Sequence, residues 1–198
     1  CGADTVYAYI VDNQQLYANE KESSTFYTFG PIRVKKDNSL ALLDGNSKST
    51  VAFDKEITVR KAELKRSFKA NVPSTLMLPF SAEIGTENHV HLFTLEEMKK
   101  NYTEDNNVDY DWVAVMKEVE DGKLEAYTPY LAMFDEDTDG MGFNNVTLKP
   151  AETAVTQRGD WYFVGLSDYR VITLDDMINE WGFFYGYAGQ AFDGYKLG

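Results

Sequence analysis

Cysteine is almost absent from this chain, and the only one is the first residue, Cys1. A single thiol excludes an intrachain disulfide. Three interpretations of Cys1 stay open. It is the lipid-attachment residue of a mature bacterial lipoprotein, the nucleophile of a self-processed amide hydrolase activated by its own α-amine, or simply the point where a processed chain or fragment begins.

Long apolar runs and an excess of basic residues are lacking as well. No run approaches the roughly 18 apolar residues of a membrane-spanning helix, so no transmembrane segment is expected. The 198 residues include 19 basic and 32 acidic ones, with a formal net charge of −13. This negative field disfavours nucleic acids and anionic membrane surfaces as partners. It favours solubility outside the cell and leaves carboxylates available for cations.

Short segments with two-residue alternation dominate the rest of the sequence and predict an all-β fold. With 43% hydrophobic and 14% aromatic residues, the chain can bury a substantial core. Only residues 94–100 and 173–181 have a helical pattern, each opening on a threonine with an acid three residues later. Both are too short to connect parallel strands, so the sheets should be mainly antiparallel. We therefore predict a β-sandwich or rolled sheet with two short helices.

The pattern also suggests a boundary near residue 55. Residues 1–55 read as an N-terminal hairpin region, either a small subdomain or the remnant of a preceding module. Residues 56–198 read as the main β-sandwich domain. Within it, residues 74–80 form an apolar strand pattern with Pro73 before it and Pro79 inside it. Since proline cannot donate to a strand ladder, this pattern is predicted to be an edge strand, a strand end or a bulge.

Several motifs resemble those of one domain family. They are Arg66-x-Phe68 with the pattern at 74–80, His-Leu-Phe-Thr at 91–94, Ala-Tyr-Thr-Pro-Tyr-Leu at 126–131, Asp-Trp-Tyr-Phe-Val-Gly at 160–165 and Tyr-Gly-Tyr-Ala at 185–188. Together they resemble an uncharacterised β-rich domain of large secreted and cell-surface proteins from gut and rumen bacteria of the Fibrobacter and Bacteroides kind. The family usually has asparagine where this chain has Tyr127. The resemblance runs from about Leu40 onward and carries no catalytic assignment. It implies a surface habitat and a main domain whose final strand is either missing or supplied otherwise.

The best candidate for chemistry is the acidic turn Asp-Glu-Asp-Thr-Asp-Gly at residues 135–140. Asp135, Asp137 and Asp139 alternate and precede a glycine, a pattern that suits calcium, which prefers oxygen ligands and a sharply turning loop. Position twelve of an EF-hand loop would be Val146 rather than glutamate, so backbone carbonyls or Glu136 would have to complete the site. A solvated acidic turn is the alternative.

Histidines and aromatic residues supply weaker signals. His89 and His91 fall on one face of a predicted strand, a spacing that metal sites use, but the chain has no third histidine. We favour an exposed strand face. Trp161, Phe163 and Tyr185 fall on alternating positions and are expected to stack in the core. An aromatic stripe is also what a glycan-binding face uses.

These observations predict a non-enzymatic module of an extracellular or bacterial outer-surface protein that serves adhesion, carbohydrate binding or structural spacing. The expected partners are a glycan or a surface protein, and self-assembly through strand pairing is a further prediction. Calcium is the one cofactor predicted. Two alternatives stay open, a secreted glycan-active hydrolase that uses a carboxylate pair and a subunit of a surface filament.

Overall fold

A computed structural model describes residues 6–11, 14–19, 25–47, 49, 51–84, 89–102, 110–151 and 155–164. Within these ranges the chain forms strands and turns and no helix, and most neighbouring strands run antiparallel. The prediction of a mainly antiparallel all-β fold is confirmed. In this part of the chain, no helix has the length and hydropathy to cross a membrane.

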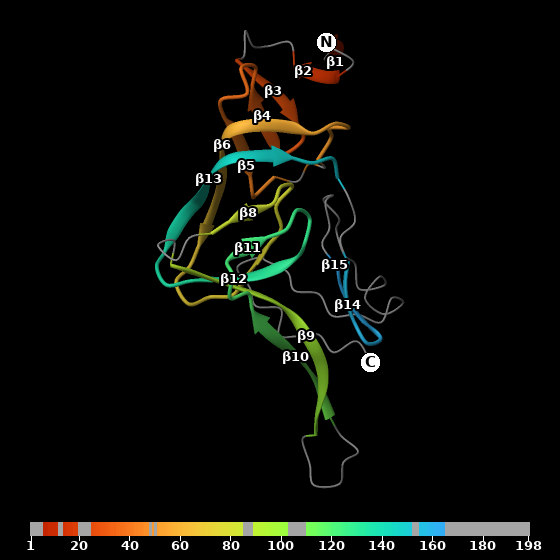
Figure 1. Ribbon diagram of the computed structural model, residues 1–198, viewed down its shortest axis with the longest axis vertical. Helices are drawn as coiled ribbons and strands as arrows, with labels where there is room; N and C mark the ends of the chain where they lie inside the picture. The colour runs from red at the N-terminus through yellow and green to blue at the C-terminus, as the bar shows by residue number, and fades with distance from the viewer. Residues whose placement is uncertain are drawn as a thin grey trace, which may run out of the picture.

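The larger of the two main sheets has five strands in the order β13-β6-β5-β4-β3 and occupies the upper part of Figure 1. Its strands are β3 (Phe26–Phe29), β4 (Ile32–Lys35), β5 (Ala41–Asp44), β6 (Ile57–Phe68) and β13 (Thr138–Leu148). β5 and β6 run parallel, and the other neighbours are antiparallel. The predicted boundary at residue 55 falls between β5 and β6, so strands from both sides of it share one sheet.

The second sheet has four strands in the order β10-β9-β12-β7. Its strands are β7 (Ser74–Leu76), β9 (Val90–Tyr102), β10 (Tyr110–Glu118) and β12 (Tyr130–Phe134). Only residues 90–93 of β9 pair with β12, whereas residues 93–102 pair with β10. Residues 94–102 and 110–117 therefore form a two-stranded β9–β10 arm, which Figure 1 shows extending away from the rest of the fold.

Three two-stranded pairs complete the described fold. They are β1 (Val6–Val11) with β2 (Gln14–Asn19), β8 (Ala82–Glu83) with β11 (Lys123–Leu124), and β14 (Val155–Arg158) with β15 (Trp161–Val164). Both β14 and β15 contact β9. The β14–β15 hairpin therefore lies beside the β9–β10 arm.

The two main sheets share one hydrophobic core. Along β6 every buried side chain is apolar, and polar or charged residues occupy most of the positions between them. Phe68 of β6 stacks on Phe134 of β12 with 4.4 Å between the ring centroids. Phe80 contacts Phe143 of β13 edge-on at 5.1 Å. These aromatic contacts join the sheets because each ring buries a large apolar surface against the other.

The helix predicted at residues 94–100 is wrong, because these residues continue β9. In the antiparallel register with β10, Thr94 lies opposite Lys117 and Lys100 lies opposite Trp112. A two-turn helix has little stability of its own. Pairing with β10 therefore outweighs the local preference that the threonine cap and the acidic residues create.

A bulge in β9 explains the misleading pattern. Leu95 and Glu97 lie opposite consecutive residues of β10, so Glu96 is an extra residue in the ladder. Leu95 and Met98 consequently share a face although they are three positions apart, which is the spacing expected of a helix. The second predicted helix, residues 173–181, lies outside the described residues.

Of the strand pattern predicted at residues 74–80, only residues 74–76 form a strand, and this strand lies at the edge of its sheet in the described part of the chain. β7 is three residues long and, within the described residues, pairs only with β12. Pro79 lies beyond the end of β7, so it removes no donor from the ladder. The edge position agrees with the prediction, but the predicted strand was too long, because the chain leaves the ladder before Pro79.

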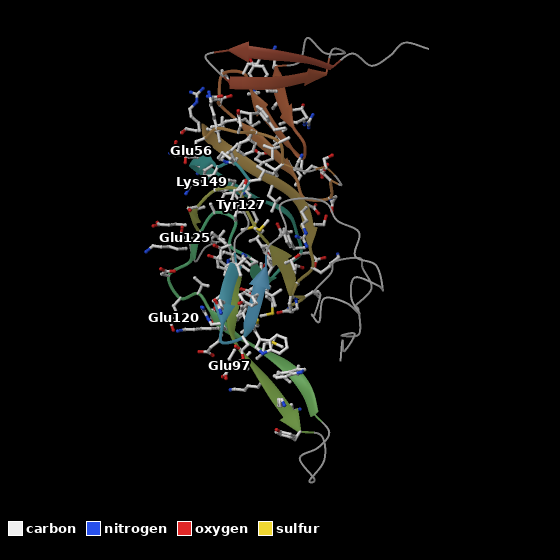
Figure 2. All side chains as sticks on the ribbon, turned by 90° about the vertical axis from the view of Figure 1, so that its right-hand side faces the viewer. Glu56, Glu97, Glu120, Glu125, Tyr127 and Lys149 are labelled. Atoms are coloured by element: carbon white, nitrogen blue, oxygen red, sulfur yellow. The ribbon has the colours of Figure 1, made fainter. Side chains whose placement is uncertain are left out.

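Tyr127 closes the core next to this segment. Its side chain is 1% exposed, its hydroxyl donates to the Lys149 carbonyl at 2.6 Å, and its N–H donates to the Leu78 carbonyl at 2.7 Å. Figure 2 shows Tyr127 and Lys149 close together in the body of the fold. The φ of Tyr127 is 57°, in the left-handed region that asparagine tolerates better than tyrosine. The buried ring and its hydrogen bonds hold the residue there.

Candidate functional site

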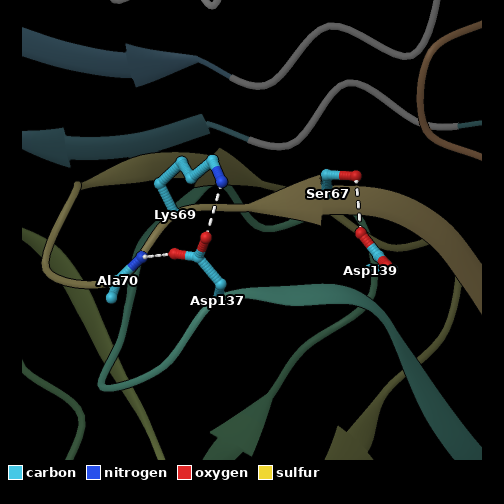
Figure 3. A network of polar contacts seen from close by, with 5 residues as sticks. All are labelled: Ser67, Lys69, Ala70, Asp137 and Asp139. Carbon is cyan, nitrogen blue, oxygen red and sulfur yellow. Dashed lines mark hydrogen bonds and ion pairs between the residues drawn. The ribbon is translucent and has the colours of Figure 1, made fainter.

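The predicted calcium turn connects β12 of the four-stranded sheet to β13 of the larger sheet, and two of its aspartates contact the end of β6 and the residues that follow it. Asp137 accepts hydrogen bonds from the Lys69 ammonium at 2.5 Å and from the Ala70 N–H at 2.9 Å. Asp139 accepts one from the Ser67 hydroxyl at 2.9 Å. Figure 3 shows both carboxylates directed toward the end of β6 and the residues that follow it. The pKa of Asp137 is lowered, chiefly by the bond from Lys69. This acidic turn therefore fastens the start of β13 to the end of β6.

The three aspartates of the turn do not converge. Asp135 contacts two histidines instead of Lys69 or Ser67. Across the residues that the structure describes, no group of three or more His, Cys, Asp or Glu side chains is arranged to hold a metal ion. Calcium binding by Asp135, Asp137 and Asp139 stays a prediction, and the ion would have to displace the donors that hold Asp137.

The glycine that follows the aspartates has a structural explanation. Gly140 lies opposite Lys65 of β6, where the register of β13 shifts. A Cβ atom built on Gly140 would lie 2.2 Å from the carbonyl oxygen of Leu64. The close approach of two backbones therefore requires glycine here, whether or not a cation binds.

His91 lies between two carboxylates at the base of the β9–β10 arm. Its Nδ1 is 2.7 Å from Oε1 of Glu118 in β10, and its Nε2 is 3.4 Å from Oδ1 of Asp135, which follows β12. The second oxygen of Asp135 is 3.6 Å from Nδ1 of His89. The hydrogen bond to Glu118, with the charge of Asp135 beside it, raises the pKa of His91 above its ordinary value of 6.5. A protonated His91 therefore links β9, β10 and the β12–β13 turn.

This arrangement predicts a pH-dependent contribution to stability. Because the pKa of His91 is higher in the folded chain than in the unfolded one, its stabilisation is fully present below about pH 6.5 and is lost as the pH rises through the raised value. The His91 side chain is 44% exposed, which keeps the effect modest. Urea unfolding at about pH 6 and about pH 8.5 should show a larger loss for His91→Gln at the lower pH.

The neighbouring histidine supplies the control for this measurement. His89→Gln removes a side chain that is 68% exposed and whose contact with Asp135 is longer, so its effect should change less with pH. An equal loss from His91→Gln at both pH values would contradict the assigned role of the protonated ring.

The remaining residues singled out from the sequence lie outside the core or outside the described residues. Trp161 and Phe163 are only half-buried, so neither has the core position expected for it. Tyr185 lies outside the described residues. Cys1 also lies outside them, and its three interpretations stay predictions.

The most distinctive exposed feature is an aromatic surface made of Lys100, Tyr102, Trp112 and Trp161. Lys100 and Trp112 lie opposite each other on the β9–β10 arm, and Nζ of Lys100 is 5.4 Å from the Trp112 ring centroid. Trp161 of β15 meets Trp112 edge-on, with 4.7 Å between the centroids. Tyr102 is two residues from Lys100, on the same face of β9, and is 47% exposed.

The chemistry of this aromatic surface suits an amphipathic ligand with flat apolar faces. Both tryptophans are half-buried, so their positions are set by packing while part of each side chain stays accessible. Tryptophan, tyrosine and lysine side chains combine apolar surface with a hydrogen-bond donor group. Sugar rings match this combination, because they present C–H groups on one face and hydroxyl groups around the rim.

Sequence reasoning missed the Lys100–Trp112 pair. The two residues are twelve positions apart in the sequence. The helix predicted at residues 94–100 included Lys100, so no strand pairing was expected for it. The one available indication of a strand was the two-residue alternation of Met98, Lys100 and Tyr102. The bulge at Glu96 interrupts this alternation just before Met98.

The pKa shifts resolved for the described carboxyl groups share one direction. The carboxyl groups of Asp37, Glu63, Asp121 and Asp137 have lowered pKa values. For Glu63 the value falls to about 2, because Lys61 and Lys65 each lie 2.9 Å from its carboxylate. A general acid for glycoside hydrolysis needs a raised pKa, and among the described carboxyl groups every resolved shift is downward.

Comparisons with known proteins found no matching family model, no similar curated protein and no similar solved structure. The fold and the aromatic surface define this chain as an all-β protein with aromatic residues gathered on and beside a projecting β9–β10 arm.

Proposed function

We propose that this chain is a non-enzymatic β-sandwich module of an extracellular or cell-surface protein, and that it binds carbohydrate through the aromatic surface. The observation that carries the proposal is the Trp112–Trp161 pair, with Lys100 beside it on the projecting arm. Tryptophan and tyrosine dominate the energetics of many binding surfaces because each supplies a large rigid contact area and a polar group. A projecting arm also leaves room for a long glycan chain.

The charge and the motifs support the surface location. A net charge of −13 keeps a module soluble and disfavours nucleic acid as a partner. The motifs that resemble the bacterial surface domain agree with a module whose purpose is attachment.

A glycan-array screen with the whole chain tests the proposal. We expect binding to plant or bacterial polysaccharide fragments, and Trp112→Ala should weaken it at least about tenfold, because truncation of a tryptophan anchor typically costs more than about 1.4 kcal/mol. Lys100→Met should weaken binding as well, while it leaves the Trp112–Trp161 contact in place. Runs with calcium and with EGTA would show whether the acidic turn contributes.

Tyr162→Ala is the matched control for this screen. Tyr162 is 59% exposed on β15, but strand alternation places it on the opposite face from its neighbour Trp161. Its replacement should leave affinity unchanged. A chain that binds no glycan, or one whose affinity is the same in Trp112→Ala and Tyr162→Ala, would contradict the proposed site.

A further inference from the structure

In the described part of the chain, β10 is an edge strand that pairs only with β9, along all nine of its residues. An edge strand presents a row of backbone N–H and C=O groups that another strand can bind. Val113 in the middle of β10 is 42% exposed. Residues 112–116 read Trp-Val-Ala-Val-Met and contain no charge, glycine or proline to discourage pairing.

The other edges of the two main sheets are protected, which distinguishes β10 from them. β7 is three residues long and lies between Pro73 and Pro79. β3 is four residues long and β2 contacts it. β13 is longer, but its ladder shifts before Gly140 and is interrupted again at Asn145, which has a φ of 53°. Short length, proline and irregular backbone are the usual means of preventing edge-to-edge association.

The sequence of β10 is complementary to itself in one antiparallel register. If two copies pair about Ala114, Asp111 of each copy is opposite Lys117 of the other, and Val113 is opposite Val115. Trp112 is opposite Met116, a pairing of sulfur with an aromatic ring. Opposite charges and apolar residues at directly facing positions stabilise antiparallel strands. A shift of the register by two residues would remove the charge pairing.

We propose that this chain forms a dimer in which β10 pairs antiparallel with β10 of a second copy, centred on Ala114. Such a contact is isologous and closes after two copies, so it produces a dimer and no filament. The two four-stranded sheets become one continuous sheet. Because facing residues share a face of that sheet, the aromatic surfaces of both copies lie on the same side. The proposal is independent of what those surfaces bind, but it would make them bivalent.

Sedimentation equilibrium of the whole chain, from about 1 μM to about 1 mM at physiological salt, tests the dimer. A single edge buries a small area, so we expect a dissociation constant between these limits. Asp111→Lys and Lys117→Asp each place like charges opposite each other at two symmetric positions. Each variant should weaken the dimer by about tenfold. The double variant should regain it, and an equimolar mixture of the two single variants should associate more tightly than either alone.

Lys123→Asp on β11 is the matched control, because it changes the net charge as Lys117→Asp does but lies outside β10. It should leave the dissociation constant nearly unchanged. A chain that stays monomeric up to about 1 mM would overturn the proposal. This is the result expected if other residues of the same chain cover β10. A dimer that is unaffected by both charge reversals, or weakened equally by the control, would also overturn it.

Discussion

Replacing Tyr127 by alanine is expected to lower the free energy of unfolding by about 3–5 kcal/mol, the range for truncating a buried aromatic side chain. The ring is 1% exposed, and its hydroxyl holds the Lys149 carbonyl at 2.6 Å. Truncation opens a cavity where the segment before β8 meets the end of β13, and it frees both segments. Urea unfolding followed by tryptophan fluorescence measures the loss. An unchanged midpoint would show that the ring does not contribute to the core.

Two further variants separate the causes of this loss. Tyr127→Phe keeps the ring and removes only the hydrogen bond to Lys149, so it should cost about 1–2 kcal/mol. Tyr127→Gly removes the same side chain as alanine does but relieves the left-handed backbone, whose φ is 57°. At most positions glycine is less stable than alanine. Here we expect glycine to equal or exceed alanine in stability, because alanine retains a strain of about 1 kcal/mol.

Gly140→Ala is expected to cost about 3 kcal/mol of stability, at the upper end of the range for overpacking. The added Cβ would lie 2.2 Å from the Leu64 carbonyl oxygen. That atom belongs to the backbone of β6 and cannot turn aside as a side chain could. β13 would therefore have to separate from β6 at the register shift, close to the points where Asp137 and Asp139 fasten the two strands.

Gly142 supplies the control within the same strand. A Cβ built on Gly142 meets nothing within 4 Å, so Gly142→Ala should change stability by no more than about 0.5 kcal/mol. Thermal or urea unfolding of both variants without added calcium compares them directly. If Gly140→Ala were destabilising only in the presence of calcium, the glycine would belong to a cation loop and our structural explanation would be wrong.

The acidic turn at residues 135–140 shows what a sequence pattern can predict and what it cannot. Alternating aspartates before a glycine are a sound reason to consider calcium, because residue type and spacing are visible in a sequence. The partners of those aspartates are not visible. Lys69 and Ser67 are about seventy residues away from Asp137 and Asp139 along the chain, and only the pairing of β6 with β13 brings them within hydrogen-bonding distance.

In the β9–β10 arm, by contrast, a local pattern predicted the wrong secondary structure. Its threonine and acidic residues form a genuine local helix signal, yet the segment is a strand because β10 supplies a partner along its whole length. A bulge of one residue shifted the alternation enough to resemble a helix. The error also concealed the aromatic surface, since Lys100 and Trp112 become neighbours only after the two strands pair.

Residue order alone was sufficient for the all-β class and the antiparallel preference. These follow from two-residue alternation and short segment length, which are properties of neighbouring residues. The role of the acidic turn, the need for glycine at position 140, the left-handed Tyr127 and the Trp112–Trp161 contact were decided by tertiary structure. Each depends on atoms from segments distant in the chain, and no local pattern records which of those segments will meet.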